Sequence, residues 1–145
     1  MSAVEVNGKR FVPYLPEAEL QARVAQLADR LNRELADKDP VFLAVLNGAF
    51  MFAADIFRRM SIPCEISFVK LASYSGMRSS GSIRELIGLN EGLRGRHVVV
   101  IEDIVDTGNT LVALLAALEA REPAAIEICT LLSKHTAHQH PMHLH

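Results

Sequence analysis

An apolar run in this chain passes directly into acidic residues and a glycine turn, VVVIEDIVDTGNT at residues 98–110. The run from Val98 to Ile101 is typical of a strand buried on both faces, as in a parallel sheet. Glu102 and Asp103, called here the acid pair, are then expected to emerge at the carboxyl end of that strand. In open α/β sheets this is the edge where ligands bind. The sequence therefore predicts a ligand site there.

The acid pair is followed by a turn that opens the helix-forming segment LVALLAALEA. A helix start presents unpaired N–H groups and a positive dipole end, which suit a phosphate. A Walker loop would place a lysine among its glycines, and this turn has none, which argues against a nucleoside triphosphate. Carboxylates beside a phosphate instead suit a ribose 5-phosphate, whose hydroxyls they can bind, or a magnesium ion. The phosphate turn consists of Asp106, Thr107, Gly108, Asn109 and Thr110.

A simpler interpretation of the same residues is a strand that ends in solvated acids, followed by a helix capped by Asp or Thr. The strand that ends in acids, or the helix start, would alone favour that interpretation. The two features joined in this order favour the ligand site.

Strand and helix patterns alternate along the chain, which predicts one α/β domain. Apolar residues at helical spacing predict a first helix over residues 16–37, and an apolar-rich segment predicts a second helix from Phe50 to Met60. We expect a core domain over residues 1–134 and a histidine-rich tail, disordered or altered, over residues 135–145. The other predicted strands are Val41 to Leu46, Glu65 to Ala72 and Ile126 to Leu132.

Composition excludes some partners and compartments. The net charge of −2 provides no general attraction to nucleic acid or to an acidic membrane. No apolar run is long enough to span a membrane, and the first residues do not resemble a signal peptide, so we expect a cytoplasmic protein. Cys64 and Cys129 lack metal-site spacing and are expected to be buried free thiols.

The segment EDIVDTGNT resembles the phosphoribosyl pyrophosphate (PRPP) signature of type I phosphoribosyltransferases, in the form found in their hypoxanthine/guanine branch. The segments 46–50, 73–74 and 131–134 also follow the order of that family, so the resemblance covers residues 5–134. It implies a doubly wound, mainly parallel sheet flanked by helices. It also implies a magnesium-dependent reaction in which hypoxanthine or guanine displaces pyrophosphate from PRPP, giving a nucleoside 5′-monophosphate, IMP or GMP.

The resemblance divides the acids of the signature between two tasks. Glu102 and Asp103 would hold the ribose hydroxyls or Mg²⁺, and the phosphate turn would bind the 5′-phosphate. Asp106 lies nearer the glycosidic end of such a ribose and is the candidate general base, accepting or sharing the proton at N7 of the purine. Asp106 could instead be only the N-cap of the following helix.

Two further segments would bind pyrophosphate according to the resemblance. The first is the Leu46–Gly48 loop, made of Leu46, Asn47 and Gly48, where the family often has a cis peptide at the first bond. The second is Ser73 with Tyr74, ahead of a glycine- and serine-rich segment, Gly76 to Gly81, that would act as a lid and exclude water. A plain strand-to-helix turn and a mobile loop are the alternatives.

Lys134 corresponds to the family's base-binding lysine. An ammonium group has donors and no acceptor, so it favours a purine with oxygen at position 6 over adenine. A solvated lysine at a strand end is the alternative.

After Lys134 the sequence HTAHQHPMHLH departs from the family, which continues with an aromatic and acidic segment that covers the base. We therefore expect an incomplete hood, with measurable binding of PRPP and magnesium but poor purine turnover. The histidines are interpreted as an altered tail rather than a metal site. We also expect homo-oligomers, dimers or tetramers. The competing hypotheses are a PRPP-binding regulatory protein that attaches to RNA and an inactive fragment.

Overall fold

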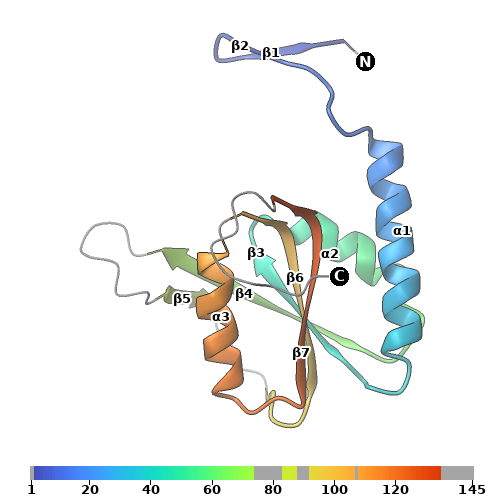
Figure 1. Cartoon of the computed structure of the whole chain (residues 1–145), viewed down its shortest axis with the longest axis vertical. Helices are drawn as coiled ribbons and strands as arrows, with labels where there is room; N and C mark the ends of the chain where they lie inside the picture. Colours follow the sequence, from blue (N-terminus) through green and yellow to red (C-terminus); the bar gives the residue numbers. More distant parts are fainter. Residues whose placement is uncertain (1, 74–82, 88–91, 107, 135–145) are drawn as a thin grey trace.

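A five-stranded sheet with the strand order β5-β4-β3-β6-β7 forms the centre of the protein (Figure 1). The structure is a computed structural model that describes residues 2–73, 83–87, 92–106 and 108–134. The strands are β3 (Val41–Leu46), β4 (Glu65–Ser73), β5 (Ile83–Ile87), β6 (His97–Val105) and β7 (Ala125–Ser133).

Four of these strands are parallel to one another, and only β5 runs antiparallel, along the outer edge of β4. Val41 of β3 is paired with Glu65 of β4 on one side and with Val98 of β6 on the other. The carboxyl ends of β3, β4, β6 and β7 consequently meet at one edge of the sheet. The predicted mainly parallel α/β fold is confirmed.

Helices cover both faces of the sheet. Helix α1 (Glu17–Glu34) and helix α2 (Phe50–Phe57) pack on one face, and helix α3 (Asn109–Glu119) packs on the other (Figure 1). Alternate residues of β6 point to opposite faces, so Val99 joins the core with α1 and α2, whereas Val98 joins the core with α3. Burial on both faces explains why this strand is continuously apolar.

Helix α1 follows the apolar spacing of its sequence. Its buried positions Val24, Ala28 and Leu31, with Leu35 at the C-cap, lie on one stripe against the sheet. The helix begins after Pro16, whose fixed φ is compatible with a helix start, and it ends slightly before the predicted boundary.

Three strands were not expected from the sequence. The N-terminal segment, interpreted as a polar lead, forms a hairpin of β1 (Val4–Val6) and β2 (Lys9–Phe11), which extends beyond the start of α1 in Figure 1. Its turn residues Asn7 and Gly8 have positive φ angles of 51° and 71°, and Asn-Gly is the sequence signal for such a hairpin. Strand β5, with the sequence IRELI, lacks the apolar run or alternation that would have marked it.

Both cysteines are free thiols, with Cys129 buried in β7 and Cys64 half-buried just before β4. Among the described residues, no helix is both long enough and apolar enough to cross a membrane. The cytoplasmic location stays a prediction.

Candidate functional site

The acid pair lies inside β6 rather than after it, which corrects the sequence-based boundary. Pairing between β6 and β7 continues past Ile101, with Glu102 opposite Thr130 and Val105 opposite Ser133. The strand persists because the backbone ladder needs no apolar side chains, and β7 is long enough to pair with it. The rigid sheet, not a loop, therefore holds the two carboxylates.

The phosphate turn joins β6 to α3 through a left-handed glycine. Gly108 has φ 88° and is the N-cap of α3, and its carbonyl accepts a hydrogen bond from the backbone N–H of Val112 at 2.9 Å. A residue with a side chain would be strained at this φ. Because Gly108 occupies the cap position, two residues after Asp106, the alternative that Asp106 serves as the N-cap is wrong.

A cavity of about 200 Å³ separates the end of β6 from the start of α3. It includes four residues expected from the signature, and Asn109 lies exposed at the adjoining helix start. Thr107 lies outside the described residues. The apolar lining residues Ile104, Val105 and Leu111 were not predicted, because apolar side chains give no signal for binding phosphate, hydroxyls or metal. The lining residues are Glu102, Ile104, Val105, Asp106, Gly108, Thr110 and Leu111.

The environment of Glu102 favours its protonated form. Burial, the side-chain hydrogen bond with Asp103 and the charge of Asp103 raise the pKa of Glu102 to about 8, although its Oε1 accepts a hydrogen bond from the backbone N–H of Asp103 at 3.2 Å. Two carboxyl groups held this close are electrostatically unfavourable when both are ionised. A bound cation would relieve that repulsion.

The acid pair fits the donor set of Mg²⁺. Magnesium sites commonly use one or two carboxylates and complete their coordination with water and substrate phosphates. Within the described ranges, no group of three or more His, Cys, Asp or Glu side chains could hold a metal by itself. The arrangement therefore suits an ion that binds together with a phosphate-bearing substrate.

The Leu46–Gly48 loop joins β3 to α2 beside the acid pair. The Leu46–Asn47 peptide bond is cis, as the family resemblance implies. Asn47 and Gly48 are exposed, and Gly48 lies directly against the carboxyl group of Asp103. The structure thus brings this loop and the end of β6 together.

Lys134 is another predicted residue that the structure brings to this edge. Its backbone N–H donates to the carbonyl oxygen of Val105 at 2.8 Å, and its Nζ lies 3.9 Å from Oδ1 of Asp106. Ser73 is the last residue of β4, at the same edge. Tyr74, the proposed lid at Gly76 to Gly81 and the tail at 135–145 lie outside the described residues.

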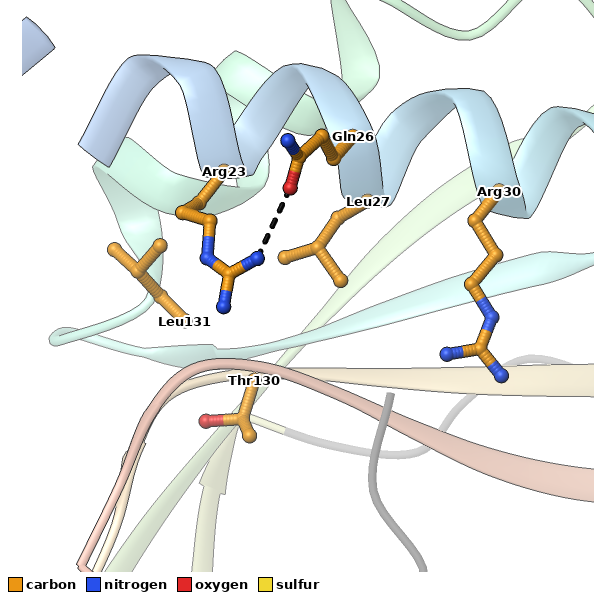
Figure 2. A pocket seen from close by; sticks show the side chains of 6 residues that line it. All are labelled: Arg23, Gln26, Leu27, Arg30, Thr130 and Leu131. Atoms are coloured by element: carbon orange, nitrogen blue, oxygen red, sulfur yellow. Dashed lines mark hydrogen bonds between the residues drawn. The ribbon is translucent and has the colours of Figure 1, made fainter. Parts of the chain in front are cut away.

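Thr130 carries no signal in the sequence, but it is a buried polar residue opposite Glu102. Its Oγ1 donates to the carbonyl oxygen of Leu132 at 2.8 Å. It also lines a separate cavity of about 340 Å³ between α1 and β7 (Figure 2). There Arg23 donates to Oε1 of Gln26 at 3.0 Å. None of the predicted site residues that the structure describes lines this second cavity. Its lining residues are Arg23, Gln26, Leu27, Arg30, Thr130 and Leu131.

Comparisons with known proteins agree with this arrangement. Residues 14–144 match the phosphoribosyl transferase domain family. The chain is 41% identical over 123 residues to the hypoxanthine phosphoribosyltransferase of Escherichia coli, covering 83% of this chain and 69% of the relative. It is 39% identical over 116 residues to the hypoxanthine-guanine-xanthine phosphoribosyltransferase of Tritrichomonas foetus, covering 80% of this chain and 63% of the relative.

A solved structure supports the same assignment. The crystal structure of a hypoxanthine-guanine phosphoribosyltransferase from Bacillus anthracis superimposes with a TM-score of 0.84 at 32% identity, covering 90% of this chain and 78% of that one. The resemblance inferred from the signature is confirmed. This chain belongs to the phosphoribosyl transferase family, in the branch that contains the hypoxanthine and hypoxanthine-guanine phosphoribosyltransferases.

Proposed function

We propose that this protein is a purine salvage transferase that moves the phosphoribosyl group of PRPP to N9 of hypoxanthine or guanine. The products would be IMP or GMP and pyrophosphate. The observation that carries the proposal is the gathering of the acid pair, the phosphate turn, the Leu46–Gly48 loop and Lys134 at one edge of the sheet. Each of these groups suits a different part of the two substrates.

The cavity between β6 and α3 suits the ribose 5-phosphate of PRPP. Its phosphate would bind the phosphate turn, where backbone N–H groups at the start of α3 and the hydroxyls of Thr107 and Thr110 are donors. Gly108 would let the backbone approach the phosphate closely. Glu102 and Asp103 would accept hydrogen bonds from the 2′- and 3′-hydroxyls or bind Mg²⁺.

The pyrophosphate of PRPP would bind the Leu46–Gly48 loop together with Ser73 and Tyr74. The position of this loop beside Asp103 supports the proposal, because a metal at the acid pair would then lie next to the pyrophosphate. When bound, Mg²⁺ would neutralise charge on the departing pyrophosphate.

The purine would occupy the side of the site formed by Asp106 and Lys134. The Asp106 carboxylate would take or share the N7 proton as N9 attacks, which contributes about 10²–10⁴ in rate for a general base. Lys134 would donate to the 6-oxo group and thereby disfavour adenine. Their separation of 3.9 Å supports this arrangement, because N7 and the 6-oxo group lie on the same edge of a purine.

We further propose that residues 1–134 form the catalytic core and that the chain forms homo-oligomers. Exposed apolar side chains support self-association, since Phe50 and Phe68, which line one hollow of the surface, are 57% and 36% exposed. Sedimentation velocity would test the second point, and a monomer at all concentrations would contradict it.

A competition assay tests the reaction and the choice of base together. The protein is incubated with PRPP, Mg²⁺ and an equal mixture of hypoxanthine, guanine, xanthine and adenine, and the monophosphates are identified by mass. We expect IMP or GMP, with little AMP. Binding of PRPP without any nucleotide product would contradict the proposed transfer and leave the regulatory protein and the inactive fragment as the alternatives. No binding of PRPP would refute both the transferase and the regulatory protein.

A further inference from the structure

Gly48 has no room for a side chain at the point where its backbone meets Asp103. A Cβ atom placed on Gly48 would lie 2.6 Å from Oδ2, 2.9 Å from Cγ and 3.0 Å from Oδ1 of Asp103. Real Cβ atoms essentially never approach other heavy atoms within 3.0 Å. All three atoms belong to the carboxyl group, so a side chain at this position would displace that group.

The backbone conformation of Gly48 does not itself require glycine. The described glycines with positive φ are Gly8, Gly95 and Gly108, and Gly48 is not among them. Alanine would therefore be compatible with the backbone at Gly48, and only the nearby carboxyl group excludes it. The absence of a side chain at Gly48 thus leaves room for the carboxyl group of Asp103.

We propose that Gly48 is a positioning residue that allows the Asp103 carboxyl group to lie against the Leu46–Gly48 loop. The proposal rests on the proposed function, in which Asp103 binds Mg²⁺ or a ribose hydroxyl. Gly48 therefore links the Leu46–Gly48 loop to the acid pair through direct contact. This role is additional to any contact that its own backbone makes with pyrophosphate.

The surroundings leave Asp103 one main response to a methyl group on Gly48. Its backbone belongs to β6 and is held in the sheet. The loop is also held, because Ala49 N donates to the carbonyl oxygen of Val45 at 3.1 Å and Phe50 N to that of Asn47 at 3.2 Å. The carboxyl group would consequently rotate away from the loop, and its distance from Glu102 would change too.

A double-mutant cycle separates the positioning of Asp103 from any direct contact between the Gly48 backbone and the ligand. The four proteins are the wild type, Gly48→Ala, Asp103→Ala and the double variant, and each is measured for its melting temperature without ligand and for its Kd for PRPP with Mg²⁺ by calorimetry. We expect Gly48→Ala to lower the melting temperature and to weaken PRPP binding about tenfold, a coupling of ordinary size for residues in contact. In the Asp103→Ala background the same change should have almost no further effect, because the obstructing carboxyl group is absent.

Gly92→Ala is the matched control, since no atom lies within 4 Å of a Cβ placed there and its φ is not positive. It should change neither quantity. Equal effects of Gly48→Ala in both backgrounds would overturn the proposal, because the glycine would then act through its own backbone. If Gly48→Ala alone does not fold, recovery of folding in the double variant supports the proposal and its absence refutes it.

The melting temperature and the Kd for PRPP test the role of Gly48 and the proposed function separately. If the wild type does not bind PRPP, the proposed function fails. The melting temperatures would still decide whether Gly48 and Asp103 are coupled.

Discussion

The Nζ atom of Lys134 lies 3.9 Å from Oδ1 of Asp106, and the two side chains are 61% and 59% exposed. They follow neighbouring parallel strands, β7 and β6, so the sheet topology brings together residues that are distant in the sequence. An exposed ion pair contributes only about 0–1 kcal/mol to stability. Substitutions at either position should therefore report on function rather than on folding.

Asp106→Asn should abolish the general base and leave the fold intact. Because Asp106 is exposed and does not cap α3, we expect a change in unfolding free energy of less than about 1 kcal/mol. Binding of PRPP should persist, and turnover should fall at least about tenfold, since general-base catalysis contributes about 10²–10⁴. Steady-state kinetics with hypoxanthine measure this, and unchanged turnover would remove Asp106 from that role.

Lys134→Gln should alter the choice of base. A glutamine amide can accept a hydrogen bond as well as donate one, so it no longer penalises an amino group at position 6. We expect the ratio of kcat/KM for hypoxanthine to that for adenine to fall by about tenfold or more, with little change in PRPP affinity. Lys38→Gln, at an exposed lysine, is the control. An unchanged ratio would mean that Lys134 does not contact the 6-position.

The raised pKa of Glu102 predicts how stability depends on pH without metal. This pKa rises from 4.5 to about 8, so the folded state retains a proton that the unfolded chain releases. The resulting contribution to stability is fully present below the unfolded pKa and is lost as pH rises through the folded pKa. The unfolding free energy should therefore decrease between about pH 5 and pH 8, and Glu102→Gln should reduce that dependence.

Urea unfolding of both proteins at several pH values tests this expectation. Mg²⁺ favours ionised Glu102, so metal and substrate together should also reduce the loss of stability at high pH. The same pH dependence in wild type and Glu102→Gln would show that another group is responsible.

The buried faces of the sheet should carry most of the stability. Phe42 is 1% exposed, and its ring packs edge-on against Phe57 with centroids 6.4 Å apart. Phe42→Ala should cost about 3–5 kcal/mol of unfolding free energy. Phe11→Ala, in the N-terminal hairpin where the side chain is 54% exposed, should cost less than about 0.5 kcal/mol. Comparable losses at the two positions would contradict this assignment of the core.

Sequence patterns predicted the elements whose burial is regular. Strand β3 was predicted with its observed bounds, because Pro40 and the Asn47-Gly48 pair delimit an unbroken apolar run. The end of β6 was placed too early, because the acids within it look like the start of a loop. Strand β5 was missed because pairing along the edge of β4 needs no distinctive pattern of its own.

For the site, too, sequence patterns predicted some features, whereas others depend on tertiary packing. The signature located the acid pair and the phosphate turn, and the parallel topology explains why they meet Lys134. The contact between Gly48 and Asp103 could not be predicted, because it depends on how the β3–α2 loop packs against β6. Knowing that a glycine is present does not reveal which side chain occupies the space beside it.

Release of pyrophosphate from PRPP shows whether the proposed transfer takes place. The protein is mixed with PRPP and Mg²⁺, with and without hypoxanthine, and pyrophosphate and IMP are measured together. The proposed function predicts that pyrophosphate release requires both hypoxanthine and the metal. One IMP should form for each pyrophosphate released, and the rate should be lower in Asp106→Asn. Pyrophosphate release that is absent, or that proceeds equally without hypoxanthine, would contradict it.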